Sequence, residues 1–361
     1  MIARLPIRSL PLALGVAFGW LLTWPSPAVR PAPPVTPLLQ TVTRQMAETR
    51  VQAVASPLFS PAPVSLWSYS WAVAAVEDVA QLPEGAPFRR LLPTLLAGFD
   101  AYWDGAANPP AYAPYPHPSA TTVKFFDDNA WTGLDLVTAY RLTHNPRYLH
   151  QAEAVFRYEQ SGWDPQGGGI FWNDQRRMRN TPANAPTAQL AAELYAETHR
   201  AAYLQWAIRI QRWETQHLVN PRTGAVYDHI SATGHLGRRT LSYNQGSVIG
   251  ADVALYQVTH HPTYLHQAEK TARFASQNLA FSTARPLSVA FAGVLADNLH
   301  QLWKVTHAPT VSTTVSRLAS AISQPAPSEW AGDPMHHLLW ESGAIRVTAA
   351  VRAVVVPHRS H

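Results

Sequence analysis

Two aspartates stand side by side in the stretch "KFFDDNAWTGLDLVTAYRLT", residues 124–143. Apolar residues follow them at helical spacing, so the pattern predicts an amphipathic helix that starts near Asp127 and Asp128. Two carboxyl groups this close cannot both ionise easily, so the pKa of one should rise while the other stays charged. Such a pair can perform acid–base chemistry. The same two residues could instead cap the helix and complement its dipole, which is a common arrangement.

Further polar and aromatic residues stand in the loops and at another predicted helix start. "SGWDPQGGGIFWND" (161–174) predicts a tight turn followed by an extended segment, and its triple glycine lacks the Lys-Ser/Thr ending of a phosphate loop. "NPRTGAVYDHI" (220–230) predicts a turn and a short extended piece, and "LSYNQGSVIGADVALY" (241–256) opens another helix. Carboxylates, carboxamides and flat aromatic faces together suit a sugar-binding site.

The chain contains a repeat that indicates how these residues are positioned. Tyr140, Tyr195 and Tyr256 are each followed by Thr at +3, His at +4, Tyr at +8 and Ala at +12, and a weaker fourth copy starts at Trp303. The copies are spaced by about 47 to 61 residues, which indicates a repeated helix–turn–helix unit. About six such hairpins fit the chain, in an open solenoid or a closed ring. A closed ring, an all-α (α/α)6 barrel, would place the loops between hairpins around one mouth.

The histidines of the repeat invite a metal-site interpretation. They recur at a turn, however, and would be dispersed around a ring, so we interpret them as structural turn residues and expect no metal and no cofactor.

Composition limits the remaining possibilities. The chain of 361 residues has 14% charged residues, thirteen Trp, a formal net charge of +5 and no cysteine. The absence of cysteine excludes disulfides, thiol nucleophiles and Cys-based zinc sites. The basic residues form no run of the kind that marks a nucleic-acid tail, so we expect no nucleic-acid partner, and we expect a monomer.

The N-terminal residues predict export. "MIARLPIR" carries positive charges ahead of the apolar run "SLPLALGVAFGWLLTW", and small residues follow at Ser26 and Ala28. We therefore expect a signal peptide over residues 1–28, with an uncleaved anchor as the alternative and no other membrane association. A Pro-rich linker over 29–40, a single domain over 41–356 and a short tail over 357–361 complete the expected organisation.

Six segments in order resemble the motifs of glycoside hydrolase family 76, the α-1,6-mannanases and their fungal cell-wall relatives. They read "FFDDNAW", "GWDPQGGGIFWN", "VYDHI", "SYNQGSVIGADVALY", "FAGVLADNL" and "ESGAIRVTAAV". The resemblance runs from about Trp67 to Val351. It implies an (α/α)6 barrel that acts on a mannan-like polysaccharide or oligosaccharide, with Asp127 as nucleophile and Asp128 as general acid/base of a retaining mechanism. Neighbouring positions at a helix start can place two carboxyls at the roughly 5 Å separation that retention requires, although rotamers could also splay them to the inverting distance.

The resemblance also implies substrate-binding positions, which we expect at Asn129, Trp131, Trp172, Asn173, Asn180, Asn184, Asp228, Tyr243, Asn244 and Gln245. Trp131 could serve equally as a sugar platform or as core. One segment departs from the family pattern, because "RNTPANAPTAQLAAELY" carries Pro182 and Pro186, which should delay the start of that helix.

Three functions remain open from the sequence. The first is an exported, endo-acting α-1,6-mannan hydrolase, secreted or associated with the cell envelope. The second is a transglycosidase that uses the same nucleophile and transfers the glycosyl group to a sugar hydroxyl. The third is a non-catalytic glycan-binding barrel or another (α/α)6 enzyme such as a sugar epimerase. The intact Asp pair disfavours a dead enzyme, and the histidine spacing does not suggest the acid/base pair of an epimerase.

Overall fold

The computed structural model describes residues 64–355, apart from residues 84, 120, 280–285 and 323–333. The expected signal peptide, the linker, the first part of the domain (41–63) and the tail lie outside the described residues. No helix within the described ranges is long and apolar enough to cross a membrane.

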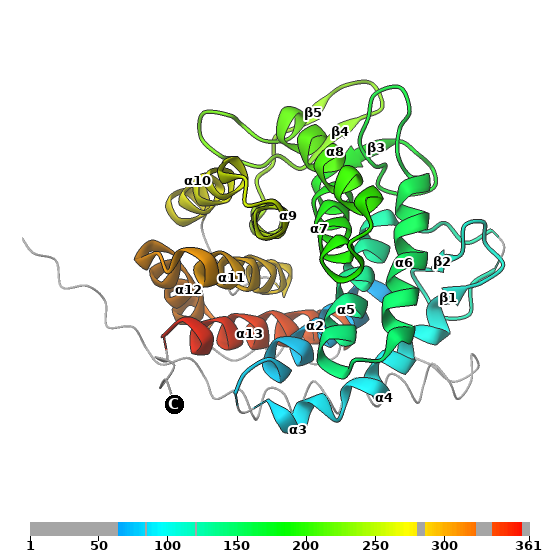
Figure 1. The fold of residues 1–361 in the computed structure, drawn as a ribbon, viewed down its shortest axis with the longest axis horizontal. Coiled ribbons are helices and arrows are strands. Elements are labelled where there is room, and N and C mark those ends of the chain that lie inside the picture. The colour runs from blue at the N-terminus through cyan, green and yellow to red at the C-terminus, as the bar shows by residue number, and fades with distance from the viewer. Residues whose placement is uncertain (1–63, 84, 120, 280–285, 323–333, 356–361) are drawn as a thin grey trace, which may run out of the picture.

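Six helices of the described chain form an inner ring: α2 (Leu66–Ala80), α5 (Phe126–Thr143), α7 (Thr181–Thr198), α9 (Ser242–Thr259), α11 (Pro286–Thr306) and α13 (Pro334–Val355). Each packs against the next in chain order, and α13 packs against α2, so the ring closes (Figure 1). The outer layer contains α6 (Pro146–Ser161), α8 (Ala201–His217), α10 (Pro262–Asn278) and α12 (Pro309–Ala321), with the short α3 (Ala86–Arg89), α4 (Leu92–Leu96) and η1 (Ala97–Tyr102) beside α2. This arrangement is the predicted (α/α)6 barrel.

The two layers differ in how much of their surface is apolar or buried. Inner helices such as α7 and α9 are buried around most of their circumference, because neighbours cover both sides. Outer helices such as α6 and α10 bury one stripe and expose charged residues on the other face, as expected for a helix that packs on one side only. The apolar core therefore lies between the layers and around the ring.

The repeated Thr-His pair ends each of four inner helices. His144, His199, His260 and His307 all have left-handed backbone, with φ between 49° and 55°. The preceding Thr hydroxyl donates to the carbonyl four residues back and accepts the amide two residues on, as Thr259 does with Leu255 and His261. This turn closes the helix and directs the chain into the outer helix. The expectation that these histidines are turn residues is confirmed.

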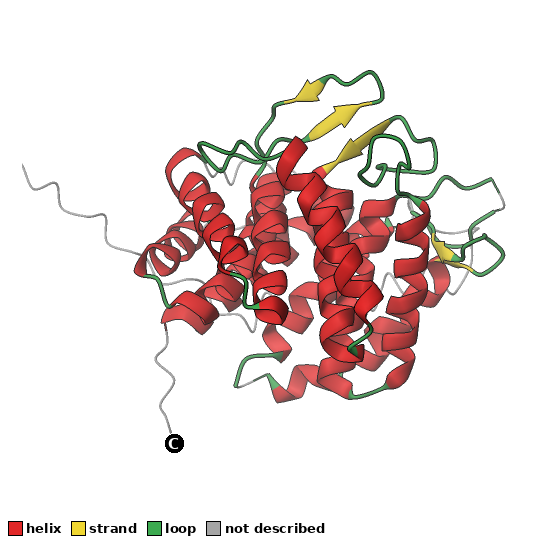
Figure 2. Cartoon of the chain, turned by 45° about the horizontal axis from the view of Figure 1, so that its top comes forward, coloured by secondary structure: helices red, strands yellow, loops and turns green. Residues whose placement is uncertain are grey.

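The short strands and longer loops lie together at the end where the inner helices begin (Figure 2). There, β3 (Met178–Asn180), β4 (His229–Ser231) and β5 (Leu236–Gly237) form an antiparallel sheet in the order β3-β4-β5. A second pair joins β1 (Trp103–Asp104) to β2 (Ala111–Tyr112). Strand β4 begins within 220–230, where the sequence predicted an extended piece. The segment predicted within 161–174 forms only isolated β-bridges among the described residues, and β3 follows it at Met178.

The two prolines do not delay α7, so that expectation is wrong. The helix begins at Thr181, with Pro182 in its first turn and Pro186 inside it. A proline in the first turn removes no helical hydrogen bond, because the amides there have no partner four residues back. Pro186 removes only the bond to the Pro182 carbonyl. Packing against the neighbouring inner helices α5 and α9 keeps the rest of the helix in place.

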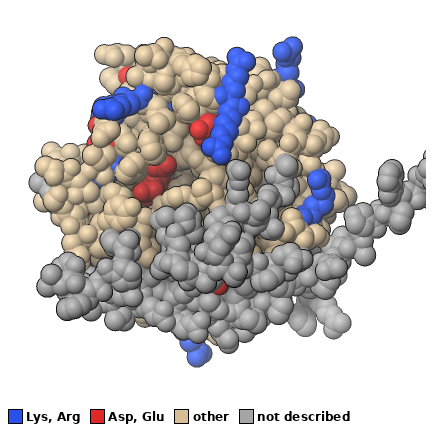
Figure 3. Space-filling view, turned by 180° about the vertical axis from the view of Figure 1, so that it is seen from behind, with Lys and Arg blue, Asp and Glu red and all other residues tan. Residues whose placement is uncertain are grey.

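Charged side chains are sparse on the face drawn in Figure 3. Lys and Arg stand apart from one another there, and acidic side chains gather where the surface is hollowed.

Candidate active site

Asp127 and Asp128 occupy the first turn of α5, and both are half-buried. The carboxylate of Asp127 accepts the Trp172 indole N–H at 2.8 Å through Oδ2 and the Asp128 amide N–H at 3.0 Å through Oδ1. The carboxylate of Asp128 has no hydrogen bond or ion pair with any residue that the structure describes. One carboxylate is therefore held in place, while the other is available to a ligand.

The electrostatics separate the two groups in the same way. Burial raises the pKa of Asp127 to about 7, while the hydrogen bonds from Trp172 and from the Asp128 amide act in the opposite direction. Burial raises the pKa of Asp128 well above its usual value, and the neighbouring negative charge of Asp127 raises it further. Asp127 is thus the first of the pair to ionise, and Asp128 is the one that keeps its proton.

The loop that carries Trp172 is fastened to the start of α5. The Phe126 amide donates to the Trp172 carbonyl at 2.9 Å, Phe125 pairs with Asn173 in a β-bridge, and the Phe125 and Trp172 rings meet edge to face at 5.1 Å. Asn173 is 8% exposed, and its side-chain oxygen accepts the Gln175 amide. The backbone pairing fixes the indole over Asp127.

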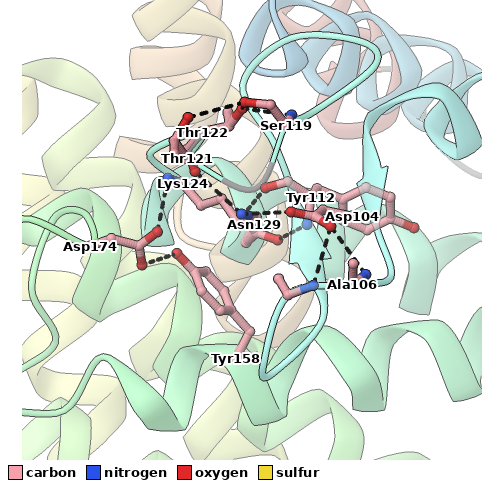
Figure 4. A network of polar contacts seen from close by, with 11 residues as sticks. Asp104, Ala106, Tyr112, Ser119, Thr121, Thr122, Lys124, Asn129, Tyr158 and Asp174 are labelled. Atoms are coloured by element: carbon pink, nitrogen blue, oxygen red, sulfur yellow. Dashed lines mark hydrogen bonds and ion pairs between the residues drawn. The ribbon is translucent and has the colours of Figure 1, made fainter.

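A polar network supports this loop from behind (Figure 4). The Asp174 carboxylate accepts the Lys124 amide at 3.0 Å and the Tyr158 hydroxyl at 2.9 Å, so it ties the loop to the chain entering α5 and to α6. The Lys124 ammonium lies 2.9 Å from the Asp104 carboxylate, and both side chains are buried. Neither Asp174 nor Lys124 stood out in the sequence, because only the fold brings them together.

Three of the expected sugar-binding amides have a different role in the structure. Asn129, Asn184 and Gln245 each stand at the fourth position of an inner helix and are fully buried. Each side-chain amide exchanges two hydrogen bonds with the backbone of one loop residue, respectively Tyr112, Ile170 and Val226. Each also donates to the carbonyl four residues back. We name these three residues the amide clamps, and we correct their expected role from substrate contact to loop attachment.

Asp228 lies close to the start of α9. Its carboxylate accepts the Asn244 side-chain amide at 3.1 Å and lies 3.1 Å from Nδ1 of His229. The Asn244 side-chain oxygen is buried without a hydrogen-bond partner among the described residues. His229 did not emerge from the sequence, although its place directly after Asp228 was a signal.

Tyr243 joins these groups to the centre of the barrel. Burial raises the pKa of its hydroxyl well above the usual value, and the negative charges of Asp228 and Asp127 raise it further, which places all three groups in one neighbourhood. Its ring stacks on Phe291 with centroids 4.2 Å apart. Asn180 lies nearby as the N-cap of α7, where its side-chain oxygen accepts the Ala183 amide.

An aromatic layer crosses the barrel below this site. Trp71 contacts Trp131, Tyr243 and Phe291, with ring centroids 5.9 to 6.4 Å apart. Trp131 is 7% exposed and lines a cavity of about 410 Å³ that includes neither Asp127 nor Asp128. Of the two roles left open for Trp131, sugar platform or core, its burial and its place in this layer favour core.

The model of a protein family described as glycosyl hydrolase family 76 matches residues 52–297. The chain belongs to that family. Membership confirms the resemblance drawn from the sequence motifs and places the protein among glycoside hydrolases.

Within the described residues, no group of three or more His, Asp or Glu side chains is arranged to hold a metal ion.

Two fungal proteins are among the curated relatives that resemble the chain. It is 25% identical over 232 residues to the mannan endo-1,6-α-mannosidase DCW1 of Eremothecium gossypii, a match that covers 59% of this chain and 49% of the relative. It is 29% identical over 127 residues to the mannan endo-1,6-α-mannosidase DFG5 of Saccharomyces cerevisiae, covering 32% of this chain and 28% of the relative. The chain thus spans half or less of the length of these relatives.

Two solved family 76 structures share the fold over nearly their whole length. An α-mannanase of Bacteroides thetaiotaomicron superposes with a TM-score of 0.72 at 21% identity, covering 87% of this chain and 96% of that one. An inactive α-1,6-mannanase variant of Salegentibacter, solved with α-1,6-mannotriose, superposes with a TM-score of 0.67 at 20% identity, covering 88% and 99%. In that variant, two consecutive aspartates are replaced by asparagine.

Proposed function

We propose that this family 76 protein hydrolyses α-1,6-linked mannan or a related cell-surface α-mannoside. It cleaves internal linkages of the polysaccharide and retains the configuration of the anomeric carbon. The observation that carries the proposal is the consecutive aspartate pair at the start of α5, of which one carboxylate is held by Trp172 and the other is available. The Salegentibacter mannanase, inactive when two consecutive aspartates are lost, supports the same pair as the catalytic groups.

In the proposed mechanism Asp127 is the nucleophile. As the more acidic group it is ionised first. The hydrogen bonds from Trp172 to Oδ2 and from the Asp128 amide to Oδ1 orient the carboxylate, one oxygen of which attacks the anomeric carbon. Asp128 keeps its proton and donates it to the departing glycosidic oxygen. A covalent glycosyl-enzyme results. Asp128, now ionised, then takes a proton from water, whose oxygen attacks the anomeric carbon and releases Asp127.

Substrate contacts in the proposal come from groups near the pair. Asp228 and Asn244 offer a carboxylate and a carboxamide to sugar hydroxyls, and the rings of Trp172 and Tyr243 offer apolar faces. Asn173 and Asn180 are largely buried, so they offer little surface to a substrate.

The location and assembly of the protein belong to the same proposal. On its N-terminal sequence we propose export to the cell envelope or beyond, followed by action as a monomer. Cell fractionation with N-terminal sequencing of the mature protein, and light scattering of the purified protein, test these two points separately.

The central experiment incubates the purified protein with linear α-1,6-mannan and follows the release of oligosaccharides. Asp127→Asn and Asp128→Asn should each abolish release, while Asp100→Asn, which alters an exposed carboxylate paired with Arg147, should leave it intact. Proton NMR of the first product should show the α-anomer, because a double displacement retains configuration.

Other outcomes would distinguish the alternatives. Products longer than the substrate would indicate a transglycosidase that uses the same nucleophile. A β-anomeric first product would overturn the retaining mechanism. Binding of mannan without any turnover, equal in the wild type and both Asn variants, would indicate a non-catalytic glycan-binding barrel.

A further inference from the structure

The 410 Å³ cavity lies inside the barrel on the far side of the aromatic layer from the Asp pair. Its lining comes from the C-terminal parts of α2, α5, α7, α9 and α11 and from the middle of α13, whereas the candidate active site stands at the N-terminal ends of the inner helices. Trp71 and Trp131 form its inner wall. The proposed hydrolase mechanism uses none of the cavity's polar residues.

Acidic residues outnumber basic residues along the cavity wall. Five acidic and three basic residues line it: Glu77, Asp78, Asp135, Glu193, Asp297, Arg141, Lys304 and Arg346. Arg346 is bound by Asp78 and Asp297 at 2.8 Å each, and Arg141 by Glu193 at 3.0 Å. Lys304 is exposed at the rim. Within the described chain Glu77 and Asp135 form no ion pair, although the charge of Arg346 acts on both.

Unpartnered hydrogen-bond acceptors face the same space. Within the described chain, Oε1 of Glu77, Oε1 of Gln189 and Oδ1 of Asn298 are buried without a hydrogen-bond partner, and all three residues line the cavity. Glu77 is 2% exposed and Asn298 is 1% exposed. The amide nitrogens of Gln189 and Asn298 are already bonded to Glu193 and to the Val294 carbonyl, which fixes the orientation of both amides. Buried acceptors in this state carry a free-energy cost that a donor would remove.

Gly250 allows two of these acceptors to converge. A Cβ at this position would lie 2.1 Å from Oδ1 of Asn298 and 2.4 Å from Oε1 of Gln189. The two oxygens thus meet over the bare backbone of α9, from helices on either side of it. One donor is also unpartnered, the indole N–H of Trp71.

We propose that this cavity binds a small organic ammonium ion that also carries a hydroxyl group. The ammonium N–H groups would bond to Glu77, Asn298 and Gln189, and its charge would offset the excess carboxylates. The faces of Trp71 and Trp131 attract the cation, and the hydroxyl oxygen accepts the Trp71 indole N–H. A neutral polyol would not favour the ionised form of these carboxyl groups, and a metal ion finds no set of three carboxylate or imidazole ligands within the described residues.

The binding should depend on pH. Burial, with repulsion between neighbouring carboxylates, raises the pKa of Glu77 well above its usual value, that of Asp78 to about 7 and that of Asp135 to about 8. The ionisation of these carboxyl groups depends on all five acidic and all three basic residues that line the cavity. A bound cation favours the ionised carboxylates, so its affinity should rise between about pH 6 and pH 8.

The test is isothermal calorimetry with two probes of the same length, 4-amino-1-butanol and 1,4-butanediol. The wild type should bind the amino alcohol and bind the diol at least about ten-fold more weakly. Glu77→Gln keeps the shape of the side chain and should lower the affinity for the amino alcohol about ten-fold or more. Gln189→Met should lower the same affinity to a smaller extent. This variant should fold, because Gln189 is only half-buried.

The matched control is Glu159→Gln. Glu159 is also fully buried, its pKa is also raised by burial and its Oε1 is also unpartnered, but it lies outside the cavity lining. This variant should bind the amino alcohol as the wild type does. Equal affinity for the two probes, undiminished binding by Glu77→Gln, or no binding by the wild type would overturn the proposal. All readouts are direct binding, so they do not depend on mannan hydrolysis.

Discussion

The indole N–H of Trp172 donates a 2.8 Å hydrogen bond to Oδ2 of Asp127, across 45 residues of chain. This contact holds one carboxylate of the pair in place and favours its ionised form. It gives the two adjacent aspartates different environments, although they share one turn of one helix.

Trp172→Phe tests this contact. The ring packing against Phe125 is kept, but the donor is lost, so the pKa of Asp127 should rise above about 7. The proposed mechanism requires an ionised Asp127, so the acid limb of the kcat/KM profile should move to higher pH by up to about one unit. Trp163→Phe, on the same loop but packed against Trp206, should leave the profile unchanged. An unshifted acid limb in Trp172→Phe would show that the bond does not tune Asp127.

The amide clamps should contribute to stability and not to substrate affinity. Gln245→Ala removes three hydrogen bonds and leaves the Val226 amide and carbonyl buried without partners. The free energy of unfolding should fall by ~3 kcal/mol, measured by urea denaturation. At a temperature where the variant is folded, KM for mannan should be close to that of the wild type. A raised KM with unchanged stability would restore the substrate-binding interpretation.

The carboxylates of the inner cavity should make stability fall with rising pH. The pKa values of Asp78 and Asp135 in the folded protein are about 7 and about 8, and that of Glu77 is also raised. Each is higher than the ordinary value of about 4 in the unfolded chain, so the folded state binds more protons in between. The free energy of unfolding should therefore decrease from about pH 4 to about pH 8.

Glu77→Gln isolates this effect. A neutral amide avoids the cost of ionising a buried carboxyl, so the variant should gain stability relative to the wild type at about pH 8 and little at about pH 5. Thermal denaturation at both pH values measures the difference. Asp100→Asn, at an exposed pair on the outside, is the control and should show no such pH dependence. A loss of stability at the higher pH would contradict the raised pKa.

The left-handed turn residues allow a further test. His199 has φ of 54°, a conformation that glycine adopts without strain and a β-branched residue adopts poorly. His199→Gly should be neutral or stabilising by up to about 1 kcal/mol, whereas His199→Val should be destabilising by ~1–2 kcal/mol. Chemical denaturation measures both. Equal effects of the two substitutions would show that backbone conformation is not what selects histidine there.

Local patterns in the sequence were sufficient for much of the architecture. The Thr-His repeat predicts the helical hairpins because the turn is made within a few residues of one chain segment, by the Thr hydroxyl and a left-handed histidine. The adjacent aspartates are recognisable for the same reason, since their chemistry follows from their being neighbours at a helix start. Prolines were a less reliable guide, because packing by α5 and α9 outweighed the single hydrogen bond that Pro186 removes from α7.

Contacts between distant segments decided the rest. The amide clamps look like ligand-binding amides in the sequence. Only the folded chain shows that each side-chain amide is hydrogen-bonded to the backbone of a residue 14 to 19 positions away. The order of ionisation of Asp127 and Asp128 depends on Trp172, and the excess carboxylates of the inner cavity come from separate helices of the ring. Burial and partner choice set these properties, and both arise only when the ring of helices closes.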